Sequence, residues 1–293
     1  MSTEILKQVI VDTEAGFIEF ARNNYQQHRN PVISVVSSGC LICVIWKDTL
    51  FVANVGDSRV ILGSHKGKFK RLHIDQVVRD HNCQNWDIQN EIIESHPNDH
   101  RRLVEVNGKW RVRGLSEISR CIGNAYMKNK EPFTDASNFE APLGHRVSLD
   151  FEEPFLSAEP EVYSRVLKDT EKFIIFGSGG FWKKITIKEA AYIVNTRPRN
   201  GIAKRLVMLA QAVAALERRK RYNDILQAPK SSHVSGRRVV ADDGSRTDFH
   251  DDMTVIVVYL DKMPNGGVRP QIRSYRGHSN TVRSSDFRNL DDM

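Results

Sequence analysis

The fold is decided by the stretch Leu50-Phe51-Val52-Ala53-Asn54-Val55-Gly56-Asp57-Ser58-Arg59-Val60-Ile61-Leu62. Its first half is dense in apolar and β-branched residues and predicts a strand, and Val60 begins another strand after residues 56–59. A similar run at residues 39–46 precedes it, and Lys47-Asp48 between the two runs suits a hairpin turn. With a further β-branched run at residues 32–36, this part of the chain is expected to form a meander of strands.

Amphipathic periodicity predicts helices in four other segments. The clearest boundary is Thr186, because a threonine N-cap with Glu189 three residues later forms a capping box. The predicted helices cover residues 3–26, 84–94, 186–194 and 201–226. The buried stripe expected in the last of them consists of Ile202, Leu206, Leu209, Val213 and Leu216. Short strands are predicted at residues 109–112, 173–176 and 254–260, and an exposed loop at residues 229–247.

The composition excludes several classes of protein. The 293 residues include 43 Lys and Arg against 36 Asp and Glu, but the net charge of +7 is spread along the chain and gives nucleic-acid binding little support. The longest apolar runs, such as residues 41–46 and 255–260, are too short to cross a membrane, and no secretory signal is visible. Four irregularly spaced cysteines predict reduced thiols. We therefore expect a cytoplasmic or nuclear protein that binds neither nucleic acid nor membranes.

Two small motifs are weak on their own. Cys40 and Cys43 form a single C-x-x-C without a second pair or histidines at zinc-site spacing, so buried core thiols on opposite faces of a strand are favoured. The segment Gly177-Ser178-Gly179-Gly180 follows a predicted strand, but Trp182 stands where the dinucleotide fingerprint needs a glycine. We interpret it as a tight turn, and a dinucleotide enzyme and a DNA-binding protein are both disfavoured.

Acidic side chains stand next to predicted strand ends. Asp57 follows one strand, and Asp251-Asp252 precede another. Carboxylates in such loops can converge on a hard cation, although each one taken alone is more typical of a turn or a cap. The order of motifs along the whole chain favours the first interpretation.

An ordered set of motifs carries a family resemblance. The motifs are Asn54-Val55-Gly56-Asp57-Ser58-Arg59, Asp80-His81-Asn82, His96-Pro97-Asn98-Asp99, Trp110-Arg111-Val112, Ser119-Arg120-Cys121-Ile122-Gly123, Phe176-Gly177-Ser178-Gly179-Gly180-Phe181-Trp182 and His250-Asp251-Asp252-Met253-Thr254-Val255-Ile256. The chain resembles the protein phosphatase 2C family of metal-dependent Ser/Thr phosphatases, most closely its plant branch, from about the first helix to Asp261. The resemblance implies an α+β fold, a four-layer α-β-β-α sandwich of two antiparallel sheets packed face to face with helices outside. One domain at residues 1–261 would precede a disordered basic tail at residues 262–293.

The resemblance also implies a metal centre, and the sequence departs from the family pattern in three places. Family members hold two Mg²⁺ or Mn²⁺ ions with aspartates, and the ions activate a water that attacks phosphorus. The family's early Asp-Gly-His-Gly-Gly segment has no counterpart, so the domain is expected to be incomplete at its N-terminus. Gly179 replaces a metal-ligand aspartate, and Asn124 replaces an acidic residue near the site. The expected remnants are Asp251, which matches the final metal ligand, and Asp57, which matches an acidic residue implicated in binding an additional metal.

These departures predict a protein serine/threonine phosphatase by family whose activity is weak or lost. No catalytic residue is carried over to this chain, and Mg²⁺ or Mn²⁺ is expected to bind weakly because hard-ion affinity depends on the number of charged oxygen ligands. The alternative is a non-catalytic pseudophosphatase that binds phosphoprotein or kinase partners. A third possibility is a fragment that does not fold stably, since missing strands expose unpaired backbone and apolar surface. We expect a monomer.

Overall fold

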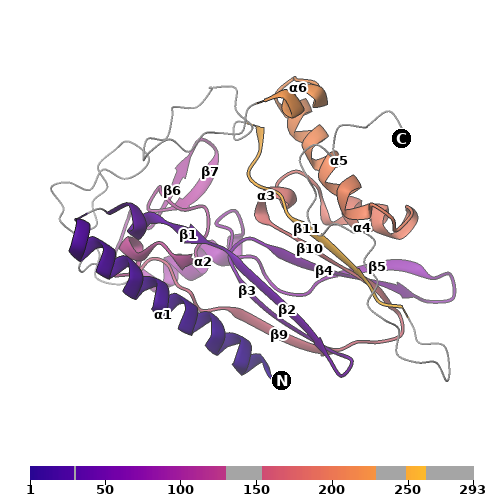
Figure 1. The fold of residues 1–293 in the computed structure, drawn as a ribbon, viewed down its shortest axis with the longest axis horizontal. Coiled ribbons are helices and arrows are strands. Elements are labelled where there is room, and N and C mark those ends of the chain that lie inside the picture. The colour runs from indigo at the N-terminus through magenta and orange to yellow at the C-terminus, as the bar shows by residue number, and fades with distance from the viewer. Residues whose placement is uncertain (30, 130–153, 229–248, 262–293) are drawn as a thin grey trace. The chain divides into compact units, whose positions relative to one another are not determined.

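The computed structural model divides the described chain into two compact units (Figure 1). The described residues are 1–29, 31–129, 154–228 and 249–261. Unit 1 comprises those within 1–58 and 78–166. Unit 2 comprises those within 59–77, 167–228 and 249–261. Each unit has an antiparallel sheet, helices and a buried apolar core of its own.

The main sheet of unit 1 has three antiparallel strands in the order β2-β3-β9. They are β2 (Cys40–Trp46), β3 (Thr49–Val55) and β9 (Glu161–Val166). Lys47 and Asp48 join β2 to β3 with φ angles of 46° and 59°, the left-handed conformation that a tight two-residue hairpin turn requires. The predicted hairpin is therefore confirmed.

Helix α1 (Thr3–His28) packs against this sheet (Figure 1). Leu6 and Ile10 on its inner face are buried against Ala53 and Val55 of β3. The burial of this apolar face explains why the predicted helix at the start of the chain forms, because helices in proteins gain most of their stability from the packing of an amphipathic face.

The remaining elements of unit 1 surround a second core. Ile88 and Ile92 are buried there together with Val112. The elements are η1 (Pro31–Val35), β1 (Ser37–Ser38), α2 (Trp86–Ser95), β6 (Leu103–Val106), β7 (Lys109–Val112), β8 (Ile122–Gly123) and η2 (Ala125–Met127). The strand predicted at residues 32–36 was wrong, because most of it forms the 3-10 helix η1. Pro31 explains this difference, since its fixed φ suits the first position of a helical turn.

The cysteines of the described residues are free thiols. Cys40 and Cys43 on β2 are partly exposed, so the expectation that both are core thiols was wrong in degree. Their strand is one of the two outer strands of its sheet, which leaves it less covered than β3. Partial burial still raises the pKa of the Cys43 thiol to about 11.

The sheet of unit 2 has four antiparallel strands in the order β11-β10-β4-β5. They are β4 (Arg59–Lys66), β5 (Arg71–Gln76), β10 (Glu171–Gly177) and β11 (Val255–Tyr259). The Phe173 ring packs directly over Gly63, where a Cβ atom would overlap it. The strands predicted at residues 173–176 and 254–260 are confirmed as β10 and β11.

Helices cover this sheet in unit 2 (Figure 1). They are α3 (Gly179–Trp182), α4 (Ile187–Thr196), α5 (Ile202–Glu217) and α6 (Tyr222–Gln227). Helix α4 begins at the predicted capping box, in which the Thr186 hydroxyl accepts the Glu189 N–H and the Glu189 carboxylate accepts the Thr186 N–H. The box satisfies two backbone donors that a helix start leaves free.

The single helix predicted for residues 201–226 is in fact two helices, α5 and α6. The chain leaves α5 where Arg219 takes a left-handed φ of 54°, and the Lys220 N–H then donates to the Ala215 carbonyl. A left-handed residue with a hydrogen bond back into the last turn is the common way for a helix to end. Amphipathic periodicity did not reveal this stop because no glycine or proline marks it.

Helix α5 buries only part of the predicted stripe, because Ile202 and Leu206 are buried whereas Val213 is partly exposed. Leu209 and Leu216 of the expected stripe are 38% and 73% exposed. Ala210 and Ala214 are fully buried instead. Their small side chains allow the helix to approach its neighbours closely, which a pattern of large apolar residues does not predict.

The α+β class, with antiparallel sheets and helices, is confirmed. The face-to-face arrangement of the sheets and the division of the chain at Asp261 stay predictions. The loop predicted at 229–247 and the tail predicted at 262–293 lie outside the described residues. In the described ranges, no helix combines the length and the apolar content needed to cross a bilayer.

Candidate metal centre

Three hydrogen bonds fix the turn after β10 to the segment before β11 in unit 2. The Ser178 N–H donates to the Thr254 carbonyl at 3.0 Å, and the Thr254 N–H donates to the Ser178 hydroxyl at 3.0 Å. The hydroxyl donates in turn to the Asp252 carbonyl at 3.2 Å. Since Ser178 also precedes helix α3, it ties residues 251–254 to the start of that helix.

Asp251 lies against the glycines of this turn. A Cβ atom placed on Gly180 would be 3.0 Å from the Asp251 Cβ and would overlap the Asp252 carbonyl oxygen, so glycine is required there. Gly179 is buried next to it in the chain. The structure therefore brings two predicted site positions, Gly179 and Asp251, to the same turn.

Asp251 forms an ion pair with Lys183. The lysine Nζ lies 2.8 Å from Oδ2 of Asp251, and the two side chains are 30% and 65% exposed. The Lys183 N–H donates to the Gly179 carbonyl at 3.0 Å, which places the lysine one helical turn after that glycine. No sequence motif pointed to a role for Lys183, although residues four apart on a helix share a side. The Asp251 carboxylate beside this turn is therefore already paired with the Lys183 ammonium group.

Asp57 lies in unit 1, in a loop that a buried asparagine holds. The Asn54 amide Nδ2 donates to the carbonyls of Gly56, Ser58 and Arg79 at 3.3, 3.0 and 3.0 Å. One side chain thus ties both ends of the loop to a separate segment. Asn54 is part of a motif in the sequence, but its supporting role could not be predicted because the carbonyl groups that it binds are known only from the structure.

His81 supports the same loop of unit 1. The Gly56 N–H donates to His81 Nδ1 at 3.1 Å, and the His81 N–H donates to the Gly56 carbonyl at 2.9 Å. Burial of the ring, together with the positive charge of Arg120, lowers the pKa of His81 to about 4. The ring is therefore neutral at pH 7 and acts as a support for the loop rather than as a group that exchanges protons near neutrality.

Asn124 follows β8 in unit 1. Its φ of 56° is left-handed, a conformation that asparagine adopts more readily than most residues, and its N–H donates to the Val36 carbonyl at 2.7 Å. Gly39 lies three residues after Val36, and a Cβ atom placed on Gly56 would be 3.0 Å from the Gly39 Cα. Residues 36–39 therefore contact both the Asn124 backbone and the loop that carries Asp57.

Neither unit offers, among its described residues, a donor set that fits a pair of divalent cations. Mg²⁺ and Mn²⁺ need several oxygen ligands, and carboxylates provide most of the affinity. Unit 2 offers Asp251, which is paired with Lys183, and unit 1 offers Asp57 with a neutral amide at Asn124. Within the residues that the structure describes, no group of three or more His, Cys, Asp or Glu side chains could hold a metal ion. No catalytic step through a metal follows from these residues.

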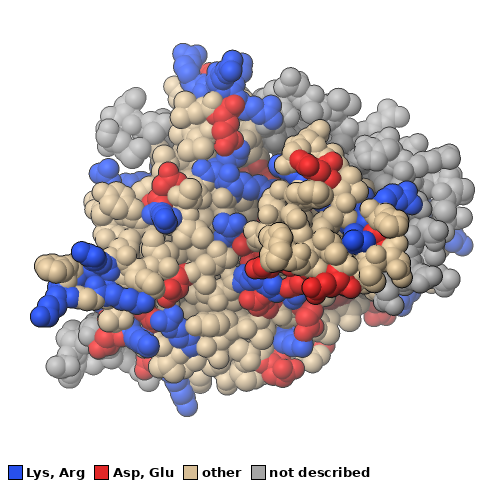
Figure 2. All heavy atoms as spheres, turned by 180° about the vertical axis from the view of Figure 1, so that it is seen from behind, with Lys and Arg blue, Asp and Glu red and all other residues tan. Residues whose placement is uncertain are grey.

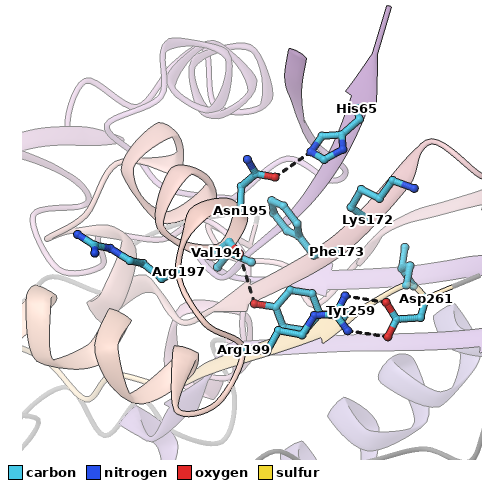
Figure 3. A pocket seen from close by; sticks show the side chains of 10 residues that line it. His65, Lys172, Phe173, Val194, Asn195, Arg197, Arg199, Tyr259 and Asp261 are labelled. Carbon is cyan, nitrogen blue, oxygen red and sulfur yellow. Dashed lines mark hydrogen bonds and ion pairs between the residues drawn. The ribbon is translucent and has the colours of Figure 1, made fainter. Parts of the chain in front are cut away.

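A separate cavity of about 410 Å³ lies at the opposite end of β10 in unit 2 (Figure 3). Arg199 binds both carboxylate oxygens of Asp261 at 2.6 and 2.7 Å and stacks on the Tyr259 ring. His65 Nε2 and Asn195 Oδ1 are 2.8 Å apart on the other side. Two pairs of lining side chains therefore bind each other, whereas Lys172 donates to the Asp169 carbonyl at 2.8 Å. Figure 3 shows Arg197 at the edge of the cavity, pointing away from the other side chains.

Charged side chains of both signs are mixed on the face drawn in Figure 2. Lys184 pairs with Glu217, and Arg221 pairs with Asp224, so basic residues of unit 2 have acidic neighbours. Among the described residues on that face, Lys and Arg do not merge into one continuous field. Such a mixture is typical of an ordinary protein surface.

Comparisons with known proteins give one consistent family. A family model described as "Protein phosphatase 2C" matches residues 6–218. The probable protein phosphatase 2C 68 of Arabidopsis thaliana is 38% identical over 293 residues, which cover 98% of this chain and 70% of that protein. The probable protein phosphatase 2C 25 of Oryza sativa subsp. japonica is 38% identical over 261 residues, which cover 89% of this chain and 62% of that protein. The chain thus spans between 62% and 70% of the length of these two relatives.

A solved structure is also similar. The crystal structure of serine-threonine phosphatase 2C from Toxoplasma gondii aligns with a TM-score of 0.47 at 16% sequence identity. The alignment covers 74% of this chain and 64% of that chain.

Proposed function

Because this chain belongs to the protein phosphatase 2C family, we propose that it is a serine/threonine phosphatase relative that hydrolyses phosphoproteins weakly or not at all. The family uses Mg²⁺ or Mn²⁺ to activate water for attack on phosphorus. In this proposal the chain keeps the family fold without a competent metal centre. Phosphoproteins are the class of molecule that it would recognise.

One observation carries this proposal. The turn Ser178-Gly179-Gly180 supplies no carboxylate, and Asp251 beside it is paired with Lys183. Among the described residues, Asp251 belongs to no group of three or more His, Cys, Asp or Glu side chains that could hold a metal ion, and a divalent cation there would have to displace the Lys183 ammonium group. Affinity for a hard cation falls steeply when carboxylate ligands are removed, so little metal would be bound at cellular concentrations. Without metal, the family reaction lacks its source of a nucleophile.

A second candidate function is a pseudophosphatase that binds phosphoprotein or kinase partners without hydrolysis. The packed cores support it over a fragment that does not fold, because residues such as Ile88 in unit 1 and Leu206 in unit 2 are fully buried. A protein that keeps its core but lacks a metal site can still present a binding surface. The free thiols Cys83 and Cys121 support a reducing compartment, the cytoplasm or nucleus, for either function.

The test is calorimetric titration of Mn²⁺ into the parent chain, run beside Mn²⁺-dependent release of phosphate from a phosphothreonine peptide. We expect no stoichiometric binding and no release above that of the Asp251→Ala variant. Stoichiometric binding that Asp251→Ala abolishes, together with peptide hydrolysis, would overturn the proposal and identify an active enzyme. If hydrolysis is absent, capture of the unhydrolysed phosphopeptide would support the binding function.

A further inference from the structure

We propose that Lys183 takes the place of a divalent cation at Asp251, so that the turn excludes metal and does not merely lack ligands. This inference deepens the proposed function and rests on it. It predicts that removal of Lys183 strengthens cation binding at this turn once a second carboxylate is present. This role of Lys183 requires that the lysine, the aspartate and the turn are held firmly together in unit 2.

The backbone that carries Lys183 is fixed by its neighbours. Phe181 and Trp182 directly before it are buried, and the Trp182 indole N–H donates to the Gly177 carbonyl at 2.9 Å. The Lys183 N–H closes the helical turn on Gly179 at 3.0 Å. Because Lys183 lies four residues after Gly179, its side chain leaves the short helix on the side of that glycine.

Asp251 is held on the same side. Its Cβ lies close to Gly180, and the next residue, Asp252, accepts the Ser178 hydroxyl hydrogen bond at 3.2 Å. The charged atoms then meet at 2.8 Å, between Lys183 Nζ and Asp251 Oδ2. This is the distance of a charge-assisted hydrogen bond, so the ammonium occupies space next to the carboxylate that a bound cation would need.

The adjacent lysine shows that this pairing is specific to one position. Lys184 points to a different partner, Glu217 on α5. The two lysines follow each other in the chain and have the same charge, but only Lys183 is paired with Asp251. Lys184 is therefore a matched control for any effect of a lost positive charge in this part of unit 2.

The size of the effect follows from simple electrostatics. A divalent cation held about 5 Å from an ammonium in water is repelled enough to change its affinity about tenfold. Salt reduces this repulsion because the pair is partly exposed. Removal of Lys183 is thus expected to raise the Mn²⁺ affinity about tenfold once a second carboxylate is present.

The experiment measures Mn²⁺ affinity by the electron paramagnetic resonance signal of free Mn²⁺, so it does not depend on activity. The variants are Gly179→Asp alone, Gly179→Asp with Lys183→Met, and Gly179→Asp with Lys184→Met. The backbone conformation at position 179 does not require glycine, since Gly179 is not among the residues with positive φ. We expect the Lys183→Met combination to bind about tenfold more tightly than Gly179→Asp, and the Lys184→Met combination to bind less than threefold more tightly.

Equal affinities in the two lysine combinations, or no binding in the Lys183→Met combination, would overturn the inference.

A second pair of variants leaves the turn untouched and guards against misfolding at position 179. Lys183→Glu places a carboxylate beside Asp251 and is expected to bind Mn²⁺, whereas Lys184→Glu is expected to behave like the parent. Identical behaviour of these two variants would also overturn it. Mn²⁺ binding by the parent contradicts the proposed function instead, so the two failures are distinguishable.

Discussion

The backbone N–H of Gly56 donates a hydrogen bond to Nδ1 of His81 at 3.1 Å. An acceptor nitrogen carries no proton, so the neutral ring has its proton on Nε2. Nε2 is buried and has no hydrogen-bond partner among the described residues. Protonation of His81 would bury a positive charge near Arg120, and for this reason its pKa lies at about 4. It would also break the bond to Gly56, so the loop that carries Asp57 is linked to the charge state of this ring.

We expect the protein to lose stability as the pH falls from 6.5 toward 4. An unfolded histidine gains its proton near pH 6.5, whereas His81 in the folded state gains it near 4, so the unfolded state binds more protons in this window. The contribution is fully present above pH 6.5 and is lost as the pH falls to 4, with a loss that approaches about 3 kcal/mol. Urea unfolding at about pH 7.5 and about pH 4.5 measures it.

The matched variants for this prediction are His81→Asn and His100→Asn. The asparagine oxygen at position 81 can still accept the Gly56 N–H but does not titrate, so the loss between the two pH values should shrink. His100 is exposed, and its replacement should leave the loss of the parent unchanged. If His81→Asn shows the same pH dependence as the parent, other groups cause it.

A second prediction concerns the contact of Gly63 with Phe173 in the sheet of unit 2. Gly63→Ala should lower the free energy of unfolding by about 1–3 kcal/mol, because the new methyl group would overlap the ring. Gly16→Ala is the control, since Gly16 lies inside helix α1 with nothing within 4 Å of its Cβ position. It should raise the free energy of unfolding by about 0.5–1 kcal/mol. Urea unfolding of both variants checks this, and a stabilising Gly63→Ala would show that the ring moves aside freely.

Local signals explain which parts of the fold could be predicted from the sequence. The hairpin at Lys47-Asp48 and the capping box at Thr186 depend on residues within a few positions of each other, and both were predicted. The end of α5 depends on the left-handed conformation of Arg219, which is uncommon for residues other than glycine and which the sequence therefore does not predict. The strand predicted at residues 32–36 was wrong because the prediction gave the β-branched residues more weight than Pro31, which favours the start of a helical turn.

The candidate site was predictable only in its residue types. Asp57 and Asp251 lie beside strand ends as expected, because β3 ends at Val55 and β11 begins at Val255. The ion pair of Asp251 with Lys183 joins residues that are 68 positions apart, and no local pattern predicts such a contact. Whether Asp251 can hold a metal is therefore decided by tertiary structure.

A third prediction concerns Asn54, whose amide donates to three carbonyls around the Asp57 loop. Asn54→Asp keeps the shape of the side chain but places a carboxylate among these oxygens, so all three hydrogen bonds are lost at neutral pH. We expect the free energy of unfolding to fall by at least about 3 kcal/mol. The buried carboxylate should have a raised pKa, and its protonated form can donate one hydrogen bond again, so the cost relative to the parent should be smaller at low pH.

Asn195→Asp is the control for this change. Asn195 is exposed and faces His65 Nε2 through its oxygen at 2.8 Å, which a carboxylate oxygen can replace. We expect its effect on the free energy of unfolding to stay within about 0.5 kcal/mol. Urea unfolding of both variants at neutral and acidic pH measures the difference. A cost for Asn54→Asp no larger than that of Asn195→Asp would mean that the loop does not depend on the amide, and Asp57 would then have to be held by its other contacts.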